Sequence, residues 1–120
     1  MTKRITAFSQ QNPQPTYDRP RADRLVVGNP QRTTWHHFTS ADGIMDCGIW
    51  ACEPGIWQIA FSDNKDEFFC VIEGVVRLHD ANGQVTEVRA GESAVIPAGF
   101  IGQFEVVEAV CKYYVIVERK

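Results

Sequence analysis

The feature that most constrains the fold of this chain is a series of short β-rich runs separated by turn signals. From Leu25 onward, no stretch of ten residues shows sustained helical periodicity. The runs are rich in Val, Ile, Thr and aromatic residues, and they cover residues 33–39, 44–52, 56–62, 67–72, 75–79, 84–89, 93–96, 103–107 and 110–118. Short strands at this spacing predict an all-β sandwich or barrel and exclude a parallel α/β fold.

The turn signals between these runs have a physical basis. We expect tight corners at Glu53-Pro54-Gly55 and Pro97-Ala98-Gly99, because Pro presets φ and Gly permits the positive φ that a reversal requires. Glu73-Gly74 and Asn82-Gly83 each separate two β runs, and such Gly-containing pairs favour β-hairpins. The sequence therefore predicts four chain reversals.

Length and composition indicate one domain that is stable without a disulfide bond or a structural metal. The chain has 120 residues, of which 44% are hydrophobic, and this is enough for a core of its own. No two of the four Cys have the spacing of a zinc knuckle or redox motif, so we expect buried free thiols in a reducing compartment. With no apolar run of membrane-spanning length and no apolar signal core near the first residue, we expect a cytoplasmic protein without a membrane partner.

Charged residues are distributed unevenly along the chain. Residues 1–32 carry six basic and two acidic side chains, a balance of +4, whereas the remainder carries six basic and thirteen acidic side chains, a balance of −7. The acidic body argues against a nucleic-acid partner. Residues 9–24 are almost free of apolar side chains, so we interpret residues 1–24 as an extended N-terminal arm and residues 25–120 as the domain. The basic arm is expected to lie on the acidic body of its own chain or of a partner, with anion binding as the alternative.

Two glycine-anchored patterns resemble the two motifs of the cupin family. In the first, Gly55 and Gly74 enclose Phe61-Ser62-Asp63 and Glu67 at the spacing of the family's Gly, His-x-His, Glu and Gly. In the second, Gly91 is followed after five residues by Pro97-Ala98-Gly99 and, two residues later, by Gly102. The resemblance implies a double-stranded β-helix, a small jelly-roll barrel, of the single-domain RmlC-like kind.

Further details are similar to one branch of small cupins, which includes (S)-ureidoglycine aminohydrolase and an ethanolamine-utilisation protein. The residues that carry this likeness are Trp50, Pro54, Gly55 and Trp57, then residues 71–74, 96–100 and 112–114. Many members of the branch have no assigned activity, so the likeness implies no reaction.

The metal ligands of the family are mostly missing here. In metal-binding cupins two His and a Glu of the first motif and a His of the second hold the metal, and these positions are Phe61, Asp63, Glu67 and Gly102 in this chain. Shifting the first motif by one residue places Ala60 and Ser62 at the His positions, which is no better. Because imidazole gives such sites their affinity, we predict no metal and no other cofactor. The chain's three His are expected on the surface or on the second sheet.

Glu67 is the candidate catalytic residue. Strand alternation places it on one face with Phe69 and Val71, and the motif makes that face the barrel interior. Desolvation there would raise the pKa of the carboxyl and suit it to acid or base catalysis, unless a cation compensates. The alternative is a structural Glu67 that pairs with Lys112 or Arg77, or that is solvated at the strand mouth.

The predicted ligand pocket combines aromatic walls with a few polar groups. Trp57, Ile59 and Phe61 share one face of their strand, and Gly102, Phe104 and Val106 share one face of theirs. Gly102 in place of a His is expected to leave space for a small ligand, and Lys112 and Tyr114 are expected to offer donors to an anion. The complete predicted pocket is Trp57, Phe61, Asp63, Phe69, Gly102, Phe104, Lys112 and Tyr114.

Three functions remain open from the sequence. The first is a metal-poor cupin that binds a small organic, possibly anionic, metabolite inside the barrel. The second is a hydrolase or isomerase of nitrogen or carbon catabolism with Glu67 as acid or base. The third is a structural dimerisation module, because cupins commonly pair through sheet faces and the arm could add an edge strand to a partner. We predict a homodimer on that basis.

Overall fold

The computed structural model describes residues 3–120, and these residues form a strongly curled β-sheet. Two single-turn 3-10 helices lie near the N-terminus, at Phe8–Gln10 and Ala22–Arg24. The strands are β1 (Thr16–Asp18), β2 (Leu25–Val27), β3 (Arg32–Thr39), β4 (Met45–Cys52), β5 (Gly55–Ala60), β6 (Lys65–Asp80), β7 (Val85–Arg89), β8 (Ser93–Ile96) and β9 (Ile101–Glu118). The predicted all-β fold is confirmed.

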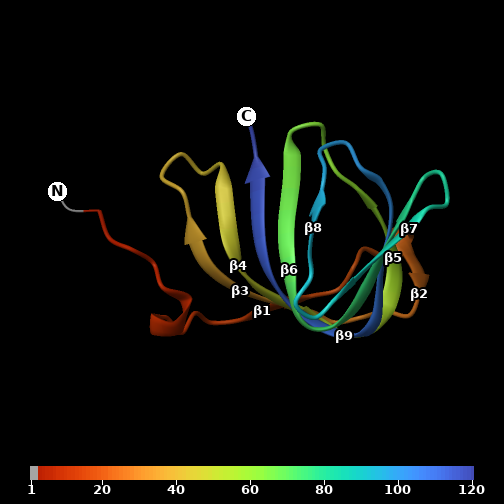
Figure 1. Cartoon of the computed structure of the whole chain (residues 1–120), viewed down its shortest axis with the longest axis horizontal. Coiled ribbons are helices and arrows are strands. Elements are labelled where there is room, and N and C mark those ends of the chain that lie inside the picture. The colour runs from red at the N-terminus through yellow and green to blue at the C-terminus, as the bar shows by residue number, and fades with distance from the viewer. Residues whose placement is uncertain (1–2) are drawn as a thin grey trace.

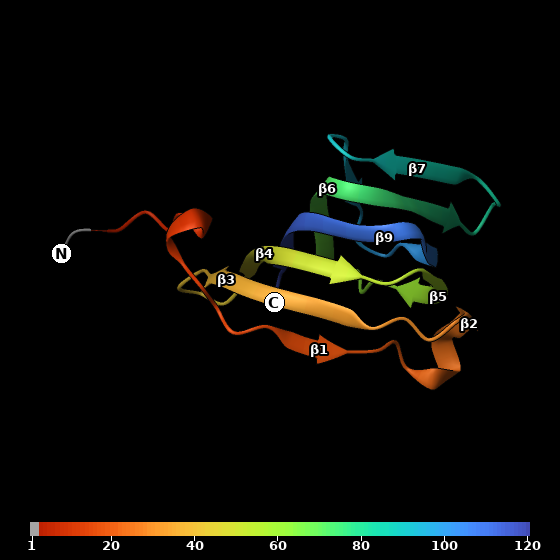
Figure 2. The same cartoon turned by 90° about the horizontal axis from the view of Figure 1, so that it is seen from below.

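Two long strands, β6 and β9, organise the sheet. They pair antiparallel with each other along almost their whole length. On its other edge, β9 pairs with β5 through its first part and with β4 through its second part. On its other edge, β6 pairs with β8 and then with β7. The sheet consequently curls into a jelly-roll half-barrel, with β3 and β1 continuing beyond β4 (Figures 1 and 2).

One predicted reversal is a bulge instead. Residues 67–72 and 75–79 were expected as two strands joined by a hairpin at Glu73-Gly74, but they are parts of the single strand β6. The register of β6 against β9 shifts between Val71 and Val76, and Gly74 has φ of +91°. A Cβ on Gly74 would lie 2.2 Å from the Ala109 carbonyl oxygen. Gly74 thus lets the strand bend over its neighbour, which is a common role of Gly at a bulge.

Two of the other three reversals occur as predicted, whereas the expected tight corner at Glu53-Pro54-Gly55 is wrong: β4 and β5 follow one another in the same direction along β9, and Gly55 is not among the glycines with positive φ. The two that occur are Asn82-Gly83, which joins β6 to β7 as a hairpin, and Pro97-Ala98-Gly99, which forms a turn between β8 and β9. Residues 103–107 and 110–118, however, are one continuous strand rather than two. Gly and Pro residues indicate where the chain bends, but they do not distinguish one bent strand from two strands.

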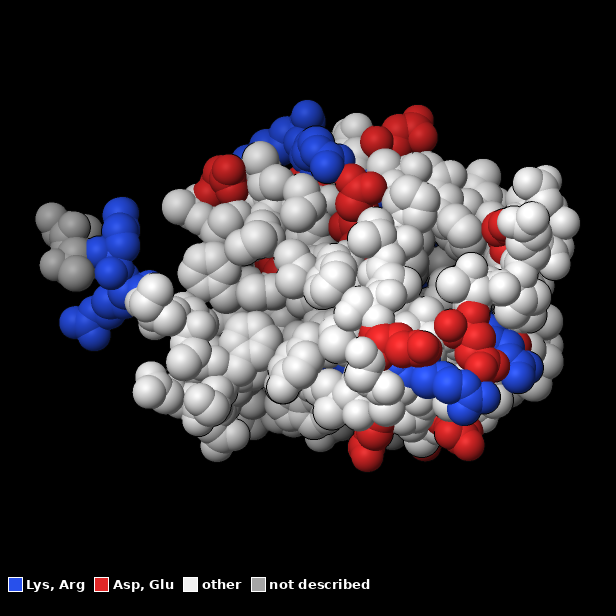
Figure 3. Space-filling view, in the orientation of Figure 1, with Lys and Arg blue, Asp and Glu red and all other residues white. Residues whose placement is uncertain are grey.

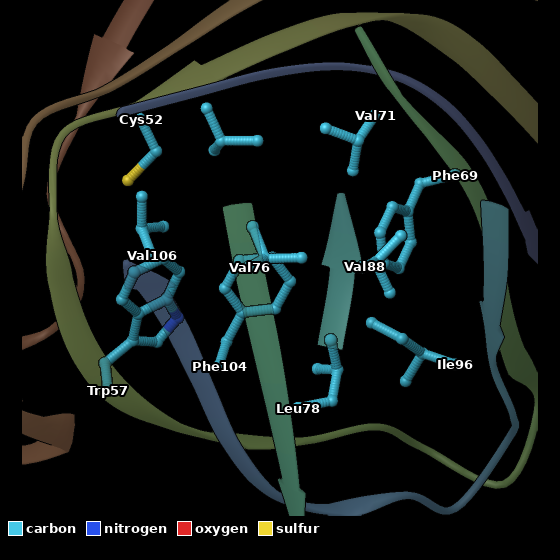
Figure 4. Packing of buried hydrophobic residues seen from close by; sticks show 11 residues of the cluster. Cys52, Trp57, Phe69, Val71, Val76, Leu78, Val88, Ile96, Phe104 and Val106 are labelled. Atoms are coloured by element: carbon cyan, nitrogen blue, oxygen red, sulfur yellow. The ribbon is translucent and has the colours of Figure 1, made fainter. Parts of the chain in front are cut away.

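The core lies on the concave side of the sheet. Eleven buried residues form one cluster, and Figure 4 shows their side chains directed toward the middle of the barrel. Phe69 and Val76 are fully buried, and Phe104 stacks on Trp57 with ring centroids 5.1 Å apart. The buried Cys52 carries a free thiol, and burial raises its pKa to about 12. These contacts close the barrel around its aromatic side chains.

The N-terminal segment joins the sheet of its own chain. Asp18 of β1 lies opposite Arg32 of β3, and β2 pairs with β5 across a bulge. Before β1 the segment still contacts β3, because Phe8 stacks on His37 and Gln11 lies within hydrogen-bond distance of it, and only the described residues ahead of Phe8 extend away from the sheet (Figure 1). The segment thus pairs with its own chain over residues 16–18, but its ion pairs in the described part of the chain, Arg21–Asp23 and Arg32–Asp18, do not reach the acidic residues beyond residue 32. The boundary between an arm of residues 1–24 and a domain of residues 25–120 remains a prediction.

In the described part of the chain, no helix has the length and apolarity needed to cross a membrane.

Candidate functional site

The curled sheet encloses a cavity of about 390 Å³. Its walls come from β1, β3, β4, β5, β6, β8 and β9, and from the loop that follows β5. The lining residues are Asp18, Arg32, Thr34, Trp50, Trp57, Ile59, Phe61, Lys65, Glu67, Ile96, Phe104, Lys112, Tyr114 and Ile116. The cavity therefore combines aromatic and aliphatic walls with seven polar or charged side chains from the same set, the mixture typical of sites for small organic ligands.

A buried ion pair lies inside this cavity. Lys112 Nζ of β9 donates to Glu67 Oε2 of β6 over 2.8 Å, and the two side chains are only 4% and 11% exposed. Of the two partners expected for Glu67, the structure selects Lys112, because Arg77 instead donates from Nε to Glu87 Oε1 over 2.9 Å. Lys112 supplies the compensating cation that a carboxylate in an aromatic cavity needs.

Aromatic rings surround the Lys112 ammonium. Its Nζ lies 4.6 Å from the ring centroid of Trp50, 4.3 Å from that of Phe69 and 4.9 Å from that of Phe104. Ring faces attract a cation, and they do so more strongly where water is excluded. Glu67 and the three rings together therefore stabilise a charged Lys112 inside the barrel.

Tyr114 provides a hydroxyl beside this ion pair. It follows Lys112 by two residues on β9, so strand alternation directs both side chains to the interior. Gly48 faces it from β4, and a Cβ there would lie 2.9 Å from the Tyr114 hydroxyl oxygen. Burial raises the pKa of Tyr114 to about 12. The phenol consequently stays protonated at neutral pH and can donate a hydrogen bond to a ligand.

The mouth of the cavity is basic. Arg32 binds the Asp18 carboxylate with Nε and Nη2, over 2.8 and 2.7 Å. Lys65 Nζ lies 4.5 Å from the ring centroid of Phe61 and forms no ion pair within residues 3–120. An adjoining pocket of about 270 Å³ shares Arg32 and Lys65 with the cavity and adds Arg21 and Arg24. Arg32 and Lys65 thus line the cavity, whereas Arg21 and Arg24 line only the adjoining pocket, where Arg21 is paired with Asp23.

The structure brings together most of the predicted pocket. Trp57, Phe61, Phe104, Lys112 and Tyr114 line the cavity with Glu67. Phe69 is fully buried behind the wall and contacts the cavity through the Lys112 ammonium. Two predicted residues, Asp63 and Gly102, lie outside the lining.

The expectation that Gly102 opens space is wrong. A Cβ built on Gly102 would lie 2.0 Å from the His79 carbonyl oxygen and 2.9 Å from the Phe100 ring. Gly102 pairs with Asp80 of β6 and with Ile59 of β5, so backbone and aromatic atoms already occupy the place of its missing side chain. The glycine serves close packing between strands rather than ligand access.

The residues present do not fit the metal of the family's motif. Asp63 lies on an exposed turn outside the cavity, Phe61 and Gly102 offer no donor side chain, and Glu67 is bound to Lys112. Within residues 3–120, no three His, Cys, Asp or Glu side chains come together as a metal site. None of the three His lines the cavity. The Lys112 ammonium therefore provides the positive charge beside Glu67.

Sequence reasoning missed several lining residues, above all those from the first strands. The residues it did not assign are Asp18, Arg32, Thr34, Trp50, Lys65, Ile96 and Ile116. Trp50 could have been found, because it alternates with Gly48 and Cys52 on the inner face of its run. Arg32 and Asp18 carry no such signal, since only the pairing of β1 with β3 brings them to the cavity.

Comparison with solved structures identifies the fold. The chain superposes with a TM-score of 0.77 on a DUF861-family protein of unknown function from Pseudomonas syringae, at 21% identity, covering 90% of this chain and 45% of that one. The EutQ protein of Clostridium difficile matches with a TM-score of 0.65 at 26% identity, covering 84% of this chain and 80% of that one. A EutQ-type protein of Salmonella typhimurium gives 0.66 at 20% identity, over 92% and 100% of the two chains. No curated protein matches the sequence.

The fold and its enclosed cavity define a small cupin. Residues 39–114 match the EutQ-like cupin domain, which is more than half of the chain. The chain belongs to this family, and the resemblance inferred from its two motifs is confirmed. This chain spans about 45% of the length of its Pseudomonas syringae neighbour.

Proposed function

We propose that this cupin binds a small organic anion inside its barrel. The observation that carries the proposal is the charge distribution of the cavity: Lys65 at the mouth has no carboxylate partner within residues 3–120, while Glu67 and Asp18 are each neutralised by a cation. Aromatic walls below the mouth suit the apolar part of such a ligand. The hydroxyl of Tyr114 offers a further donor.

An enzymatic role for Glu67 is the second candidate, and the geometry favours it less. Glu67 lines the cavity, as acid or base catalysis requires, but its Oε2 accepts a hydrogen bond from Lys112 over 2.8 Å. Proton transfer at this oxygen would first have to break a buried ion pair, which opposes such a role. If a substrate is found, an unchanged rate in Glu67→Gln would remove Glu67 from the mechanism.

The binding proposal is tested with simple carboxylates and their uncharged amides. The probes are benzoate, phenylacetate and succinate, each compared with its amide by calorimetry and by the fluorescence of Trp50 and Trp57, which line the cavity. We expect at least one carboxylate to bind at least about tenfold more tightly than its amide, because a cationic mouth favours an anion. Lys65→Met, which keeps the apolar stem but removes the charge, should weaken that binding roughly threefold to tenfold.

Lys120→Met is the matched control. Lys120 is exposed and lies outside both pockets, so the same loss of charge there should leave the affinity unchanged. Equal binding of each carboxylate and its amide, or no binding of any of the three carboxylates at millimolar concentration, would contradict the proposal.

We also propose that the convex side of the sheet pairs with a second copy of this chain. Alternation along β4, β6, β8 and β9 directs an uncharged set of side chains outward, and we call this set the outer apolar face. Its members are Cys47, Ile49, Phe68, Cys70, Val95, Tyr113 and Val115. Phe68, Val95 and Tyr113 are 45%, 59% and 46% exposed. A contiguous exposed apolar surface typically marks an interface.

A second copy is the occupant that this face suits best. Figure 3 shows that charged side chains gather at the ends and the lower right of the molecule, and that the surface over β4, β9 and β6 carries few of them. In a twofold dimer the same patch meets itself, so a patch without charge brings no like charges together.

A further inference from the structure

We propose that Asp18 occupies the place of a ligand carboxylate on Arg32, and that a bound organic carboxylate displaces it. Arg32 is then the residue that selects planar carboxylates at the mouth of the barrel. This inference rests on the proposed binding of an organic anion and names the chemical group that is recognised.

The geometry of the Arg32–Asp18 pair is that of carboxylate recognition. Nε and Nη2 of Arg32 each donate to a different oxygen of Asp18, over 2.8 and 2.7 Å. This two-point arrangement matches the planar fork of a guanidinium to a carboxylate, and a ligand carboxylate would use the same two donors. Both side chains line the cavity. A carboxylate supplied by the protein therefore already lies where the ligand's group would bind.

Arg32 lies above the aromatic wall of the cavity. It lies on β3, opposite Asp18 on one side and opposite Cys52 of β4 on the other. Its guanidinium carbon lies 5.6 Å from the ring centroid of Trp57, and its side chain is only 23% exposed. A carboxylate bound to this fork would have its apolar part directed toward Trp57, which lines the same cavity.

Asp18, in contrast, is held weakly. Its side chain is 61% exposed, and all three residues of β1 are exposed. Exposed ion pairs stabilise proteins little, because water solvates the separated charges almost as well. Rotation of the Asp18 side chain into water would free the Arg32 donors at small cost. The Glu67–Lys112 pair deeper in the cavity is shielded from water, so the same exchange there would be expensive.

The chain offers a matched control for this exchange. Asp23 lies in the same N-terminal segment and makes a similar two-point contact, accepting from Nε and Nη2 of Arg21 over 3.1 and 2.7 Å. Asp23 is exposed and lines neither the cavity nor the adjoining pocket. Asp18→Asn and Asp23→Asn thus change the net charge equally, but only the first frees Arg32.

The experiment measures the dissociation constants of benzoate and benzamide for the full chain and three variants by calorimetry. Asp18→Asn should tighten benzoate binding roughly two- to fivefold, because the competing charge is gone, and should leave benzamide unchanged. Asp23→Asn should change either constant by less than about twofold. Arg32→Lys, which keeps the charge but loses the fork, should weaken benzoate binding roughly threefold to tenfold.

The outcomes distinguish this inference from the proposed binding of an organic anion, on which it rests. If the unaltered chain binds benzoate and Asp18→Asn behaves like Asp23→Asn, or weakens binding, Asp18 does not compete for Arg32 and the inference is overturned while anion binding stands. If Arg32→Lys binds benzoate as well as the unaltered chain, Arg32 does not select the carboxylate. If neither the unaltered chain nor Asp18→Asn binds benzoate, the inference falls, and the wider proposal is then decided by phenylacetate and succinate.

Discussion

At the scale of single residues, the cavity depends on charges that neutralise each other. Glu67 keeps the motif position of a metal ligand, yet Lys112 from β9 provides the positive charge beside it. Both the carboxylate and its position on the inner face were predicted from the sequence, by the motif and by strand alternation. The choice of Lys112 over Arg77 was not, because residues far apart in the chain meet only when β6 pairs with β9.

The coupling between these two charges is testable by a double-mutant cycle. Glu67→Leu alone and Lys112→Met alone should each lower the free energy of unfolding by about 3–5 kcal/mol, because each leaves one buried charge without its partner. The double variant should recover most of that loss, since two apolar side chains need no counter-charge. Urea denaturation measures the free energy of unfolding of the two single variants and the double variant. Additive losses in the double variant would show that the pair does not act as a unit.

At the scale of elements, glycines control how closely the long strands approach. Gly102 of β9 lies beside His79 of β6, and its place in the family motif suggested an opening for a ligand. The structure shows no such opening. The backbone of β6 occupies the space that a side chain at position 102 would need. Alternation within one strand predicts which side a residue faces but not how near the neighbouring strand comes.

Gly102→Ala tests this close packing. Its Cβ would lie 2.0 Å from the His79 carbonyl oxygen, so β6 and β9 would have to separate locally. We expect a loss of roughly 1–3 kcal/mol in the free energy of unfolding, as overpacked sites typically show. Gln103→Ala, at the next position of β9, is the control and should cost less. Thermal or urea unfolding of both variants measures the difference, and an unaffected Gly102→Ala would mean that the strands yield freely.

At the scale of the whole molecule, the sheet has two apolar sides and only one of them is closed. The concave side encloses the core and the cavity, whereas the outer apolar face leaves Phe68, Val95 and Tyr113 exposed. Phe8 contacts one edge of that face, with its ring centroid 6.1 Å from that of Tyr113. The remaining apolar area supports the proposed homodimer.

Val95→Glu tests the dimer, with Val85→Glu as its matched control. Both valines are exposed, at 59% and 51%, but only Val95 belongs to the outer apolar face. In a dimer paired through this face, Val95→Glu should raise the dissociation constant at least about tenfold, because it buries two like charges near each other. Val85→Glu should have no effect. Sedimentation velocity across a concentration series measures both, and a monomeric unaltered chain would refute the pairing.

The sequence alone determined the all-β class, two of the four predicted reversals, and the inner position of Glu67. These follow from local rules, because turn residues act within a few positions and side chains alternate along any strand. Only the tertiary structure decided that Gly74 is a bulge, that Gly102 is packed shut, and that Asp18 meets Arg32 at the cavity mouth. Those features depend on how distant strands are placed against each other, and the spacing of residues along one strand does not encode that placement.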